Sequence, residues 1–358
     1  EYDWWGQYRS VFNWNTVLDN LKRIDRDNRK VEWDAIKGTA LFNRANCFYQ
    51  LAQVYTKPYN AATAQQDLGL CLRLNSDFNI PSVRASLAET YQQIIKDLNE
   101  ALPLLPKTVS HPTRPTSFAA HALLARVYLT MDDYENAKQV SEMCLSIKNN
   151  LLDFNTLDTS SSYPIPLFYE EVIFHAHTDI ALGALPAPYT FIDSNIVKSY
   201  AANDLRKSIY LSNNGDGTFS YKQMSINGGA FLFQGLSVDE LFLIKAECSA
   251  RLGKTEEAML SLNKLLEKRW LSGTFIPLTA ISSEEALKII LRERKKELLF
   301  RGTRWTDIRR LNKDSRFAIT LQRTLDKVEY KLPPNDLRYV ALIPQDVINR
   351  SNIQQNDR

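Results

Sequence analysis

The sequence predicts a mostly α-helical protein in which helical repeats are interrupted by a large irregular insert of loops and short strands. Three observations predict this class. Glycine is scarce, with 12 residues in 358, which disfavours a β-sandwich or a β-barrel. Two blocks of the chain, Ala125–Ala137 and Ala246–Ala258, can be aligned with each other. Between them, the segment 149–235 collects proline and glycine at turn positions.

The two aligned blocks share small residues, a turn and a closing alanine. Each has an apolar helix before the turn and an amphipathic helix after it. This pattern resembles the tetratricopeptide repeat, in which paired helices stack with small residues at their crossing. Two further helices fit the set, one from about Ala35 to Val54 and one from about Ser82 to Ala101. Four prolines between residues 103 and 115 predict an extended linker.

The expected organisation is one domain, 1–358, in three stretches. Helical repeats occupy 1–148, the irregular insert occupies 149–235, and the last repeat, a charged motif and a C-terminal segment occupy 236–358. In the insert, Glu171–His177 is the best predicted strand and Asn213–Thr218 is predicted to be a hairpin turn. A calcium loop is the less favoured alternative for that turn, because Gln223 stands where the closing Glu is required.

Composition excludes several classes of protein. Hydrophobic residues make up 44% and charged residues 24%, which is typical of globular proteins. No apolar run approaches the roughly 18 residues that a membrane span needs. The four cysteines are isolated, which favours small core residues over a zinc site or a disulfide framework. His175 and His177 would share one strand face, but without a third ligand nearby we expect no metal site.

The most informative stretch is the charged segment Lys288–Arg316. It holds eleven Lys or Arg and four Asp or Glu, a local charge of +7 in a chain whose net charge is +3. Apolar residues at helical spacing predict a helix here, and Gly302 is expected to end it before a second helix begins. Along the first helix, Glu293 can pair with Lys296, and Glu297 with Arg301.

We interpret this segment as a structural network of ion pairs that locks two helices together, with Arg forks bridging carboxylates and carbonyls. A nucleic-acid-binding face is an alternative, but acidic residues are interleaved and no reading motif accompanies them. An active site is a second alternative, but no nucleophile stands beside a base. The structural interpretation predicts that Glu297, Arg304, Trp305 and Asp307 are largely buried and hydrogen-bonded.

The order of these pieces resembles the SusD/RagB family of outer-membrane nutrient-binding lipoproteins. The family motif is close to R-x-E-R-x-x-E-L-x-F-E-G-x-R-W-x-D-L-R-R, and the segment that ends at Arg310 follows it. Arg301 departs from the motif by replacing a Glu, and Ile308 replaces a Leu. The Asp204-Leu-Arg206 step and the closing segment 330–356 also resemble the family. The residues expected to form the structural motif are Arg294, Glu297, Gly302, Arg304, Trp305, Asp307 and Arg309.

The resemblance implies a cell-surface, glycan-binding subunit of a TonB-dependent nutrient-uptake system, with a SusC-type transporter as its partner. It implies no enzymatic activity, no cofactor and no nucleic-acid partner. It also implies anchoring in the outer membrane through a lipid on an N-terminal part that precedes this sequence. One alternative is a peptide or another nutrient as the ligand in the same system. Another is a tetratricopeptide scaffold for protein partners, which the long insert disfavours.

Sugar binding requires aromatic platforms beside hydroxyl-binding polar groups. Trp4 and Trp5 are adjacent at the start of the first helix, beside Asp3 as a hydroxyl acceptor, although core packing explains a Trp pair equally well. Aromatic residues of the insert that follow Pro or Gly are expected on exposed loop tips. We expect Trp4 or Trp5, with one aromatic of the insert, to form the site. The candidate ligand-binding residues are Trp4, Trp5, Asp3, Tyr189, Phe191 and Phe231.

Overall fold

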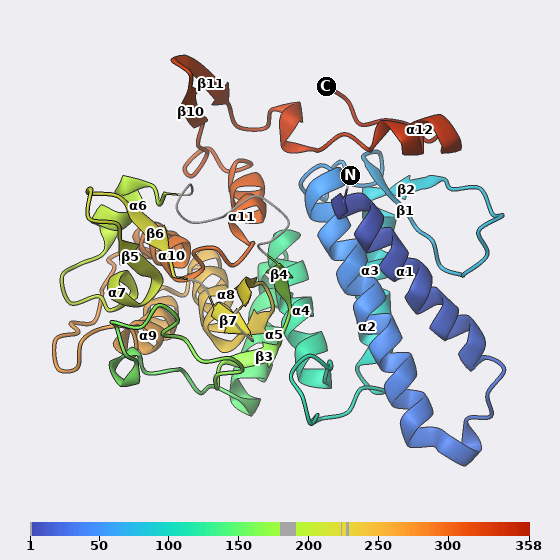
Figure 1. Cartoon of the computed structure of the whole chain (residues 1–358), viewed down its shortest axis with the longest axis horizontal. Helices are drawn as coiled ribbons and strands as arrows, with labels where there is room; N and C mark the ends of the chain where they lie inside the picture. Colours follow the sequence, from blue (N-terminus) through green and yellow to red (C-terminus); the bar gives the residue numbers. More distant parts are fainter. Residues whose placement is uncertain (1, 180–190, 223, 227–228) are drawn as a thin grey trace. The chain divides into compact units, whose positions relative to one another are not determined.

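The computed structural model describes residues 2–179, 191–222, 224–226 and 229–358. The chain forms two compact units (Figure 1). Unit 1 comprises Glu1–Val109, Pro115–Asp132 and Trp305–Arg358, and unit 2 comprises Ser110–Arg114 and Asp133–Arg304. Long helices dominate both units, so the predicted mostly helical class is confirmed. The expectation of a single domain stays a prediction.

Unit 1 is built on helix α2 (Lys30–Tyr55), which packs against α1 (Tyr2–Leu21), α3 (Leu87–Ala101) and α4 (Ser117–Thr130). These helices confirm the predicted positions near 35–54 and 82–101. Helix α3 begins five residues later than predicted because Ser86 forms a capping box. Its hydroxyl accepts a hydrogen bond from Glu89 N at 3.1 Å, and the Glu89 carboxylate accepts one from Ser86 N at 2.7 Å.

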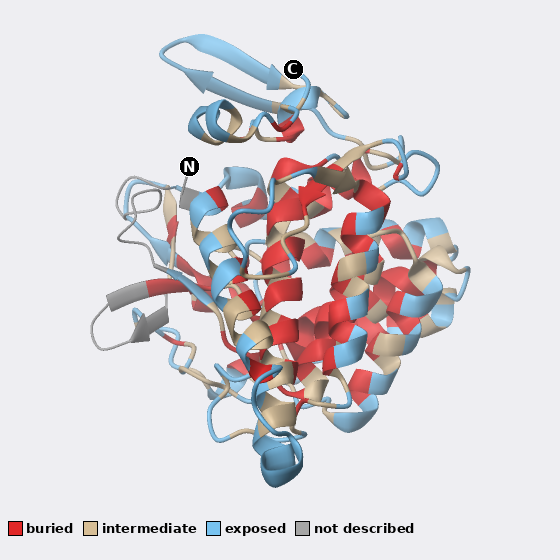
Figure 2. Cartoon of the chain, turned by 90° about the vertical axis from the view of Figure 1, so that its right-hand side faces the viewer, coloured by how far each residue is buried: buried red, intermediate tan, exposed pale blue. Residues whose placement is uncertain are grey.

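The remaining elements of unit 1 are short. Strands β1 (Leu68–Cys71) and β2 (Arg84–Ser86) pair antiparallel ahead of α3. The C-terminal part carries the β10–β11 hairpin, which is exposed along nearly its whole length (Figure 2). That hairpin consists of β10 (Leu321–Leu325) and β11 (Val328–Leu332). The C-terminal part also contains α11 (Arg304–Leu311), η4 (Leu337–Tyr339) and α12 (Gln345–Ser351), and the N-terminal part contains η1 (Asp27–Arg29).

Unit 2 has helix α8 (Val238–Arg251) at its centre. Helix α8 packs against α5 (Tyr134–Ile147), α9 (Thr255–Glu267) and α10 (Ser283–Glu297). Its side chains are buried almost without interruption from Val238 to Ala250, including the three acidic residues Asp239, Glu240 and Glu247. A helix that is covered on all sides needs partners for such charges. The charged motif supplies Arg301 for Asp239 and Arg294 for Glu240, whereas Glu247 pairs with Arg251 of the same helix.

The two predicted repeat turns have matching geometry. Three residues separate α4 from α5, and three separate α8 from α9. Asp132 and Gly253 occupy equivalent positions in the alignment, and both have positive φ, at 62° and 78°. The closing alanines, Ala137 and Ala258, are both 0% exposed. The alignment made from sequence is therefore confirmed at the turn and at the first packing position of the second helix.

The insert contains short strands, as predicted, and two short helices that were not predicted. The predicted strand 171–177 is wrong as a single element. It divides into β3 (Val172–Phe174), paired with β9 (Leu236–Ser237), and β4 (His177–Asp179), paired with β8 (Gly229–Phe233). The division falls at His175, whose backbone N donates to Pro112 O at 2.8 Å instead of to a neighbouring strand.

The predicted hairpin turn at Asn213–Thr218 is confirmed. Strands β5 (Leu211–Asn213) and β6 (Phe219–Tyr221) pair antiparallel, with Gly215 and Gly217 at φ near +86° and +87°. An apolar cluster beneath the hairpin gives the insert a core of its own. Its remaining elements are η2 (Phe154–Thr156), α6 (Ser194–Ser199), α7 (Arg206–Tyr210) and β7 (Met224–Ile226).

Candidate functional site

The adjacent tryptophans of α1 lie on different faces of the helix. Trp4 is 6% exposed, and its ring lies 4.6 Å from the Tyr8 ring and 4.9 Å from the Tyr55 ring. Trp5 is 57% exposed. Helical geometry explains the difference, because successive residues are rotated by about 100° around the axis. Core packing therefore accounts for Trp4, whereas it does not account for Trp5.

A pocket of about 300 Å³ opens in unit 1 beside Trp4 and Tyr8. Phe12, one helical turn beyond Tyr8, and Phe78, in the loop between β1 and β2, also line it. Phe12 is 46% exposed and Phe78 is 80% exposed. Trp5 and Asp3 do not line this pocket. Phe12 and Phe78 were not among the sequence-predicted site residues, because single aromatic residues in a helix or a loop have no distinctive spacing.

The loop that carries Phe78 is fixed to α1 by polar contacts. The Asn15 amide, 0% exposed, donates to Arg73 O at 2.8 Å and to Asn75 O at 3.1 Å. The Asp19 carboxylate accepts hydrogen bonds from Ser76 N and Ser76 Oγ, each at 2.8 Å. The exposed Phe78 ring is therefore presented by an anchored loop.

Two polar groups of this pocket are available to a ligand. Within the part of the chain that the structure describes, neither Asn75 Nδ2 nor Ser82 Oγ has a hydrogen-bond partner. An amide N–H donor and a hydroxyl beside exposed aromatic rings form the combination of apolar walls and few polar groups that small-molecule sites use.

The insert residues predicted to complete the site fall into three cases. Phe191 is 55% exposed, as expected of a loop position. Phe231 is 3% exposed, so the expectation of an exposed loop tip is wrong there. Phe231 lies in β8 opposite Met224 of β7, and its ring packs 5.0 Å from the His177 ring. Tyr189 lies outside the described residues. A combined site of Trp4 or Trp5 with an insert aromatic stays a prediction.

The histidine pair is divided between two environments. His175 is 3% exposed among Phe168, Phe231 and Phe233, and within the described residues neither of its ring nitrogens has a partner. Burial lowers the pKa of His175 to about 4, helped by the neighbouring His177 and His111. Among the described residues, no group of three or more His, Cys, Asp or Glu is arranged to hold a metal ion.

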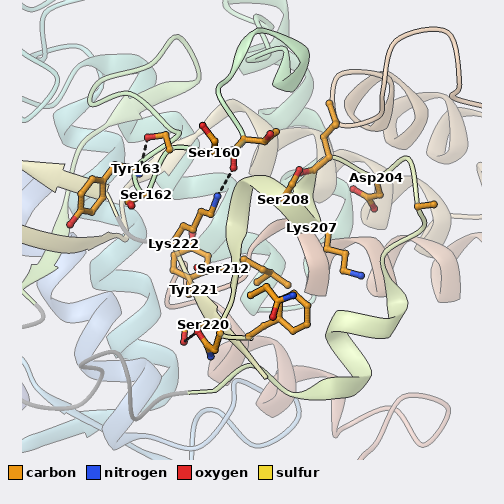
Figure 3. Close-up of a pocket in the computed structure, with 18 residues that line it drawn as sticks. Ser160, Ser162, Tyr163, Asp204, Lys207, Ser208, Ser212, Ser220, Tyr221 and Lys222 are labelled. Carbon is orange, nitrogen blue, oxygen red and sulfur yellow. Dashed lines mark hydrogen bonds between the residues drawn. The ribbon is translucent and has the colours of Figure 1, made fainter. Parts of the chain in front are cut away.

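A larger cavity of about 740 Å³ lies in unit 2 (Figure 3). It is formed by the loop 159–163, helix α7 and the β5–β6 hairpin. Its lining combines seven Ser and Thr residues with two lysines and the aromatic residues Tyr163, Phe219 and Tyr221. No residue of this lining was among the sequence-predicted site residues, because its hydroxyl groups come from separate short segments.

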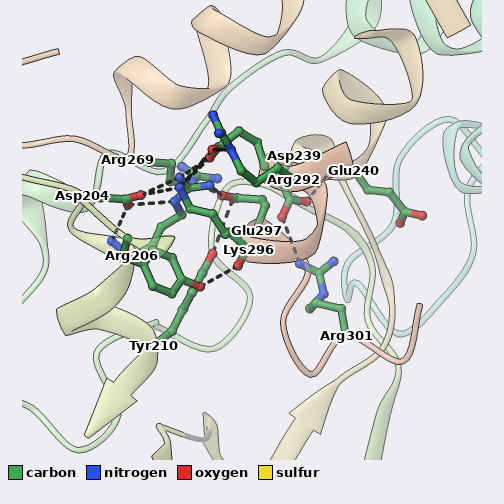
Figure 4. Close-up of polar contacts among 12 residues, drawn as sticks. Asp204, Arg206, Tyr210, Asp239, Glu240, Arg269, Arg292, Lys296, Glu297 and Arg301 are labelled. Atoms are coloured by element: carbon green, nitrogen blue, oxygen red, sulfur yellow. Dashed lines mark hydrogen bonds and ion pairs between the residues drawn. The ribbon is translucent and has the colours of Figure 1, made fainter. Parts of the chain in front are cut away.

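The first half of the charged motif forms a buried network in unit 2 (Figure 4). Glu297 Oε1 accepts a hydrogen bond of 2.7 Å from Arg269 Nε, and its Oε2 accepts one of 3.1 Å from Arg206 Nη1. Arg206 also pairs with Asp204 at 2.7 Å and with Glu293 at 2.6 Å. Arg206 and Arg269 are fully buried, and their guanidinium groups pair with both carboxylates of this half of the motif, Glu293 and Glu297.

The charges of the network control its carboxyl groups. Burial raises the pKa of Asp204, but the hydrogen bond and the charge of Arg206 outweigh burial and hold that pKa below its usual value. Burial and the charges of Arg206 and Lys296 act on Glu293 in the same way, and its pKa is also lowered. Both groups therefore stay ionised inside the unit.

One predicted pair of the motif is confirmed and one is wrong. Glu293 and Lys296 pair at 3.0 Å, as expected for residues three apart on a helix. Glu297 and Arg301 do not pair, because α10 ends at Glu297, five residues before Gly302. Arg301 instead pairs with Asp239 at 3.0 Å and donates to Ser237 Oγ at 2.7 Å. Arg301, which stands where the family motif has a Glu, thus has an acidic partner of its own.

The second half of the motif lies in unit 1. Asp307 and Arg310 are buried and pair at 2.8 Å. Arg309 donates to the carbonyl oxygens of Gln53 and Thr56, and so it caps the C-terminal end of α2. A cation there also meets the negative end of the helix dipole. Burial lowers the pKa of Arg309 to about 10.

Two expectations about the motif are wrong. Trp305 was expected to be buried, but it is 37% exposed and packs on Tyr339 with ring centroids 5.0 Å apart. Arg304 is only partly buried. Both residues lie in the first turn of the short helix α11, whose buried residues begin only at Asp307. Glu297 and Asp307 are buried and paired, as predicted.

The helices described here include none that has both the length and the apolar character to cross a membrane.

Four free cysteines are buried, which confirms their prediction as core residues. Burial raises the pKa of Cys47 to about 12, so this thiol stays protonated and unreactive near neutral pH.

Comparison with known families matches most of the chain. A SusD-like family model described as "Starch-binding associating with outer membrane" matches residues 1–129, and the SusD family model matches residues 239–356. A tetratricopeptide repeat model matches residues 118–151, which contain the first predicted repeat turn. A curated relative, SusD-like protein P2 of Formosa agariphila, is 25% identical over 86% of this chain and 71% of its own length.

Solved structures show the same fold. A SusD superfamily protein of Bacteroides thetaiotaomicron superposes with a TM-score of 0.79 at 22% identity, covering 99% of this chain and 85% of that one. A laminarin-binding SusD-like protein superposes with a TM-score of 0.70 at 17% identity, again over 99% of this chain and 85% of the other. Because SusD-type models match both ends of the chain and the fold extends over nearly all of it, this chain belongs to the SusD/RagB family of binding proteins, which are not enzymes.

Proposed function

We propose that this protein is a cell-surface glycan-binding subunit of a TonB-dependent, SusC-type nutrient-uptake system. Its family is described as starch-binding and associated with the outer membrane, which supports a carbohydrate ligand and that location. One structural relative is a laminarin-binding protein, which also supports a carbohydrate ligand. We further propose that a lipid on a preceding N-terminal segment anchors the protein.

The observation that carries the glycan proposal is the aromatic pocket of unit 1. Phe12 and Phe78 expose 46% and 80% of their surface, although burying an aromatic ring is strongly favourable. An anchored loop holds Phe78 in that exposed position. Exposed aromatic rings suit a sugar, because one face of a pyranose presents C–H groups that pack on a ring while its hydroxyl groups stay outward.

The polar groups of the pocket suit the outward hydroxyls. Asn75 Nδ2 can donate to a sugar oxygen, and Ser82 Oγ can both donate and accept. A volume of about 300 Å³ is at the lower end of the range for ligand sites, so the pocket holds a short stretch of a glycan. Trp5 and Asp3, exposed on α1, are proposed to contact further sugar units. Phe191, exposed in unit 2, stays a predicted ligand-binding residue.

A glycan array with a peptide library as a second arm identifies the ligand class. Calorimetric titration of the best ligand then compares Phe78→Ala and Phe12→Ala with Tyr330→Ala, an aromatic residue of unit 1 that is similarly exposed at 55% but lies on the β10–β11 hairpin. We expect Phe78→Ala to weaken binding about tenfold or more, since an aromatic contact contributes about 1.5 kcal/mol or more when it is removed. The Tyr330 variant should bind like the wild type.

Three outcomes decide the proposal. Binding of neutral or charged glycans with loss in the Phe78 variant supports it. Binding of peptides alone would show that the ligand in the same type of uptake system is a peptide and not a glycan. Unchanged glycan affinity in Phe12→Ala, Phe78→Ala and Trp5→Ala would remove the unit 1 pocket as the site, with the folded state of each variant checked by circular dichroism.

The proposed partner is tested separately. The anchored, full-length protein should co-purify with a TonB-dependent transporter from outer membranes solubilised in mild detergent. Recovery of the protein without any transporter under conditions that preserve other outer-membrane complexes counts against a SusC-type partner. The isolated chain is expected to show no turnover of the glycan that it binds.

A further inference from the structure

The cavity of unit 2 has a composition that differs from that of the aromatic pocket. Its volume of about 740 Å³ lies well inside the range of ligand sites. Helix α7 and the β5–β6 hairpin form its walls together with the loop 159–163 (Figure 3). The hairpin wall is fixed, because Lys222 N donates to Tyr210 O at 2.7 Å and the β5–β6 ladder pairs three residues on each side.

The charge that this cavity presents is positive. Two lysines, Lys207 and Lys222, line it, and Asp204 is the single acidic residue among the lining residues. Asp204 is 2% exposed, and its carboxylate is already bound by Arg206 at 2.7 Å and by Lys296 at 3.2 Å. It therefore offers no compensation to the two ammonium groups.

Lys222 stands at one side of the cavity and is only partly satisfied. Its Nζ donates to the carbonyl oxygen of Thr159 at 2.7 Å, which leaves two of its three N–H groups for other acceptors. Asp158 of the adjoining loop acts on Lys222 through its charge, and its carboxylate accepts hydrogen bonds from Ser160 N at 2.8 Å and Ser160 Oγ at 2.6 Å. Figure 3 shows Lys222 and Lys207 on either side of Ser212 in that view.

Lys207 has no carboxylate partner within the described residues. Its Nζ lies 5.6 Å from the centre of the Phe219 ring, a cation–π distance that orients the ammonium group without neutralising it. Two ammonium groups at the walls of the cavity make the electrostatic potential there positive. An anionic group is the ligand that such a potential attracts.

The other lining groups suit the hydroxyl groups of a sugar. The hydroxyls of Ser162 and Ser212 belong to exposed residues and have no hydrogen-bond partner in the described part of the chain. Tyr163, 47% exposed, offers a ring face at the same cavity. An ordinary anion site would need the positive groups alone, whereas this cavity combines them with free hydroxyls and an exposed aromatic ring.

We propose that the cavity between the loop 159–163, α7 and the β5–β6 hairpin is a second carbohydrate subsite, specific for a sugar that carries an oxyanion. The ligand class is a glycan with a uronate carboxylate or a sulfate ester, held by Lys207 and Lys222. The choice of a glycan rests on the proposed function, whereas the requirement for an oxyanion rests on the charges of the cavity. The site lies in unit 2 and is distinct from the aromatic pocket of unit 1.

Matched ligands test the requirement for the oxyanion. The probes are a trisaccharide of galacturonic acid, the same trisaccharide with its carboxyl groups converted to methyl esters, and a sulfated galactose trisaccharide. Calorimetric titration should show the acid binding at least about tenfold more tightly than the ester, because hydrogen bonds to charged groups are the stronger ones. Affinity for the acid should fall when salt is raised from about 0.05 M to about 0.5 M. The sulfated probe distinguishes sulfate from carboxylate as the preferred oxyanion.

Variants locate the site. Lys207→Gln and Lys222→Gln should each weaken binding of the acid several-fold, and the double variant about tenfold or more. Lys198→Gln, an exposed lysine of α6 that does not line the cavity, is the matched control and should bind like the wild type. Gln removes the charge and keeps a polar side chain that is only one methylene group shorter, so folding should be retained.

The outcomes separate this proposal from the proposed function. Equal affinity for the acid and its ester, wild-type affinity in the double variant, or no binding of either anionic probe would each overturn the second subsite. Phe78→Ala should leave binding of the acid at the cavity unchanged, because Phe78 belongs to unit 1. Conversely, if the aromatic pocket binds no glycan while the two lysines still control acid binding, the pocket of unit 1 fails and the subsite stands.

Discussion

Arg206 and Glu297 are 91 positions apart in the chain, and Arg206 Nη1 donates to Glu297 Oε2 at 3.1 Å. The same carboxylate receives Arg269 Nε at 2.7 Å through its other oxygen. One acidic residue of the signature motif therefore fastens the insert and the segment after α9 to α10. All three side chains are at most 1% exposed, so these ion pairs are shielded from water.

Glu297→Ala should be strongly destabilising. Removing this carboxylate deprives two buried guanidinium groups of one of their ion-pair partners, and breaking a buried pair typically costs about 3–5 kcal/mol. Glu284→Ala on the same helix is the matched control, because its pair with Lys288 at 2.6 Å is between side chains that are 48% and 57% exposed. Such surface pairs contribute less than about 1 kcal/mol. Urea unfolding followed by circular dichroism compares them, and equal loss of stability in the two variants would contradict the network's role.

Trp305→Ala should be a mild change, in contrast to what the motif alone suggests. At 37% exposure and with Tyr339 as its aromatic partner, Trp305 loses on the order of 1 kcal/mol of burial. Phe48→Ala, in the fully buried part of α2, should cost about 3–5 kcal/mol. Thermal unfolding of both variants measures the difference. A loss for Trp305→Ala as large as that for Phe48→Ala would show that the ring is buried in solution.

Local patterns predicted most of the fold correctly. Helical periodicity, the repeat turns at Asp132 and Gly253, and the hairpin at Asn213–Thr218 depend on residues close in sequence, and all were identified. The motif was interpreted as structural because it holds more charges beside a tryptophan than solubility requires. Its partner Arg206 was noticed only through the family resemblance of the step that contains it. No local pattern indicates that its side chain reaches Glu297.

The candidate site was harder to predict, because exposure depends on contacts between distant segments. Trp4 and Trp5 are indistinguishable in a sequence until the helix phase and the covering elements are known. Phe231 follows two glycines, which favours a loop, yet pairing with β4 and β7 places it in a sheet and buries it. The exposed position of Phe78 depends on a hydrogen bond from Asn15 to the loop that carries Phe78, about 60 positions away in the chain.

Stability of unit 2 should fall as the pH is lowered from about 6.5 to about 4. Burial lowers the pKa of His175 to about 4, against an unfolded value of 6.5. Between these values the unfolded state binds the proton and the folded state does not, so each unit of acidification costs up to about 1.4 kcal/mol. Below the folded value the effect levels off.

His175→Phe should flatten this pH dependence, since Phe fits among the surrounding rings and does not titrate. The control is Phe231→Leu, which disturbs the packing of the same cluster without removing the histidine. Urea midpoints at pH 7, 6 and 5 should fall in parallel for the wild type and the Phe231 variant. If His175→Phe retains the full wild-type slope, other groups are responsible for it.

The same substitution at two glycines should have opposite effects. Gly253→Ala places a Cβ at φ +78°, which costs about 1–2 kcal/mol for an L-residue although no atom crowds the position. Gly6→Ala, in α1 with no atom within 4 Å of the added Cβ, should stabilise by about 0.5–1 kcal/mol. Thermal unfolding of the two variants measures the signs. Stabilisation by Gly253→Ala would mean that the second repeat turn differs from the first in solution.

Trp4 and Trp5 offer the sharpest separation of structure from function, because they are identical residues at consecutive positions of one helix. Trp4→Ala removes a ring that is 6% exposed and packed against Tyr8 and Tyr55, so it should cost about 3–5 kcal/mol. Trp5→Ala removes a ring that is 57% exposed and should cost less than about 1 kcal/mol. If Trp5 contacts the glycan, as proposed, its variant loses affinity while its unfolding curve stays near that of the wild type. Unfolding curves that shift equally for the two variants would place both rings in the core, and Trp5 would then no longer be available for a ligand.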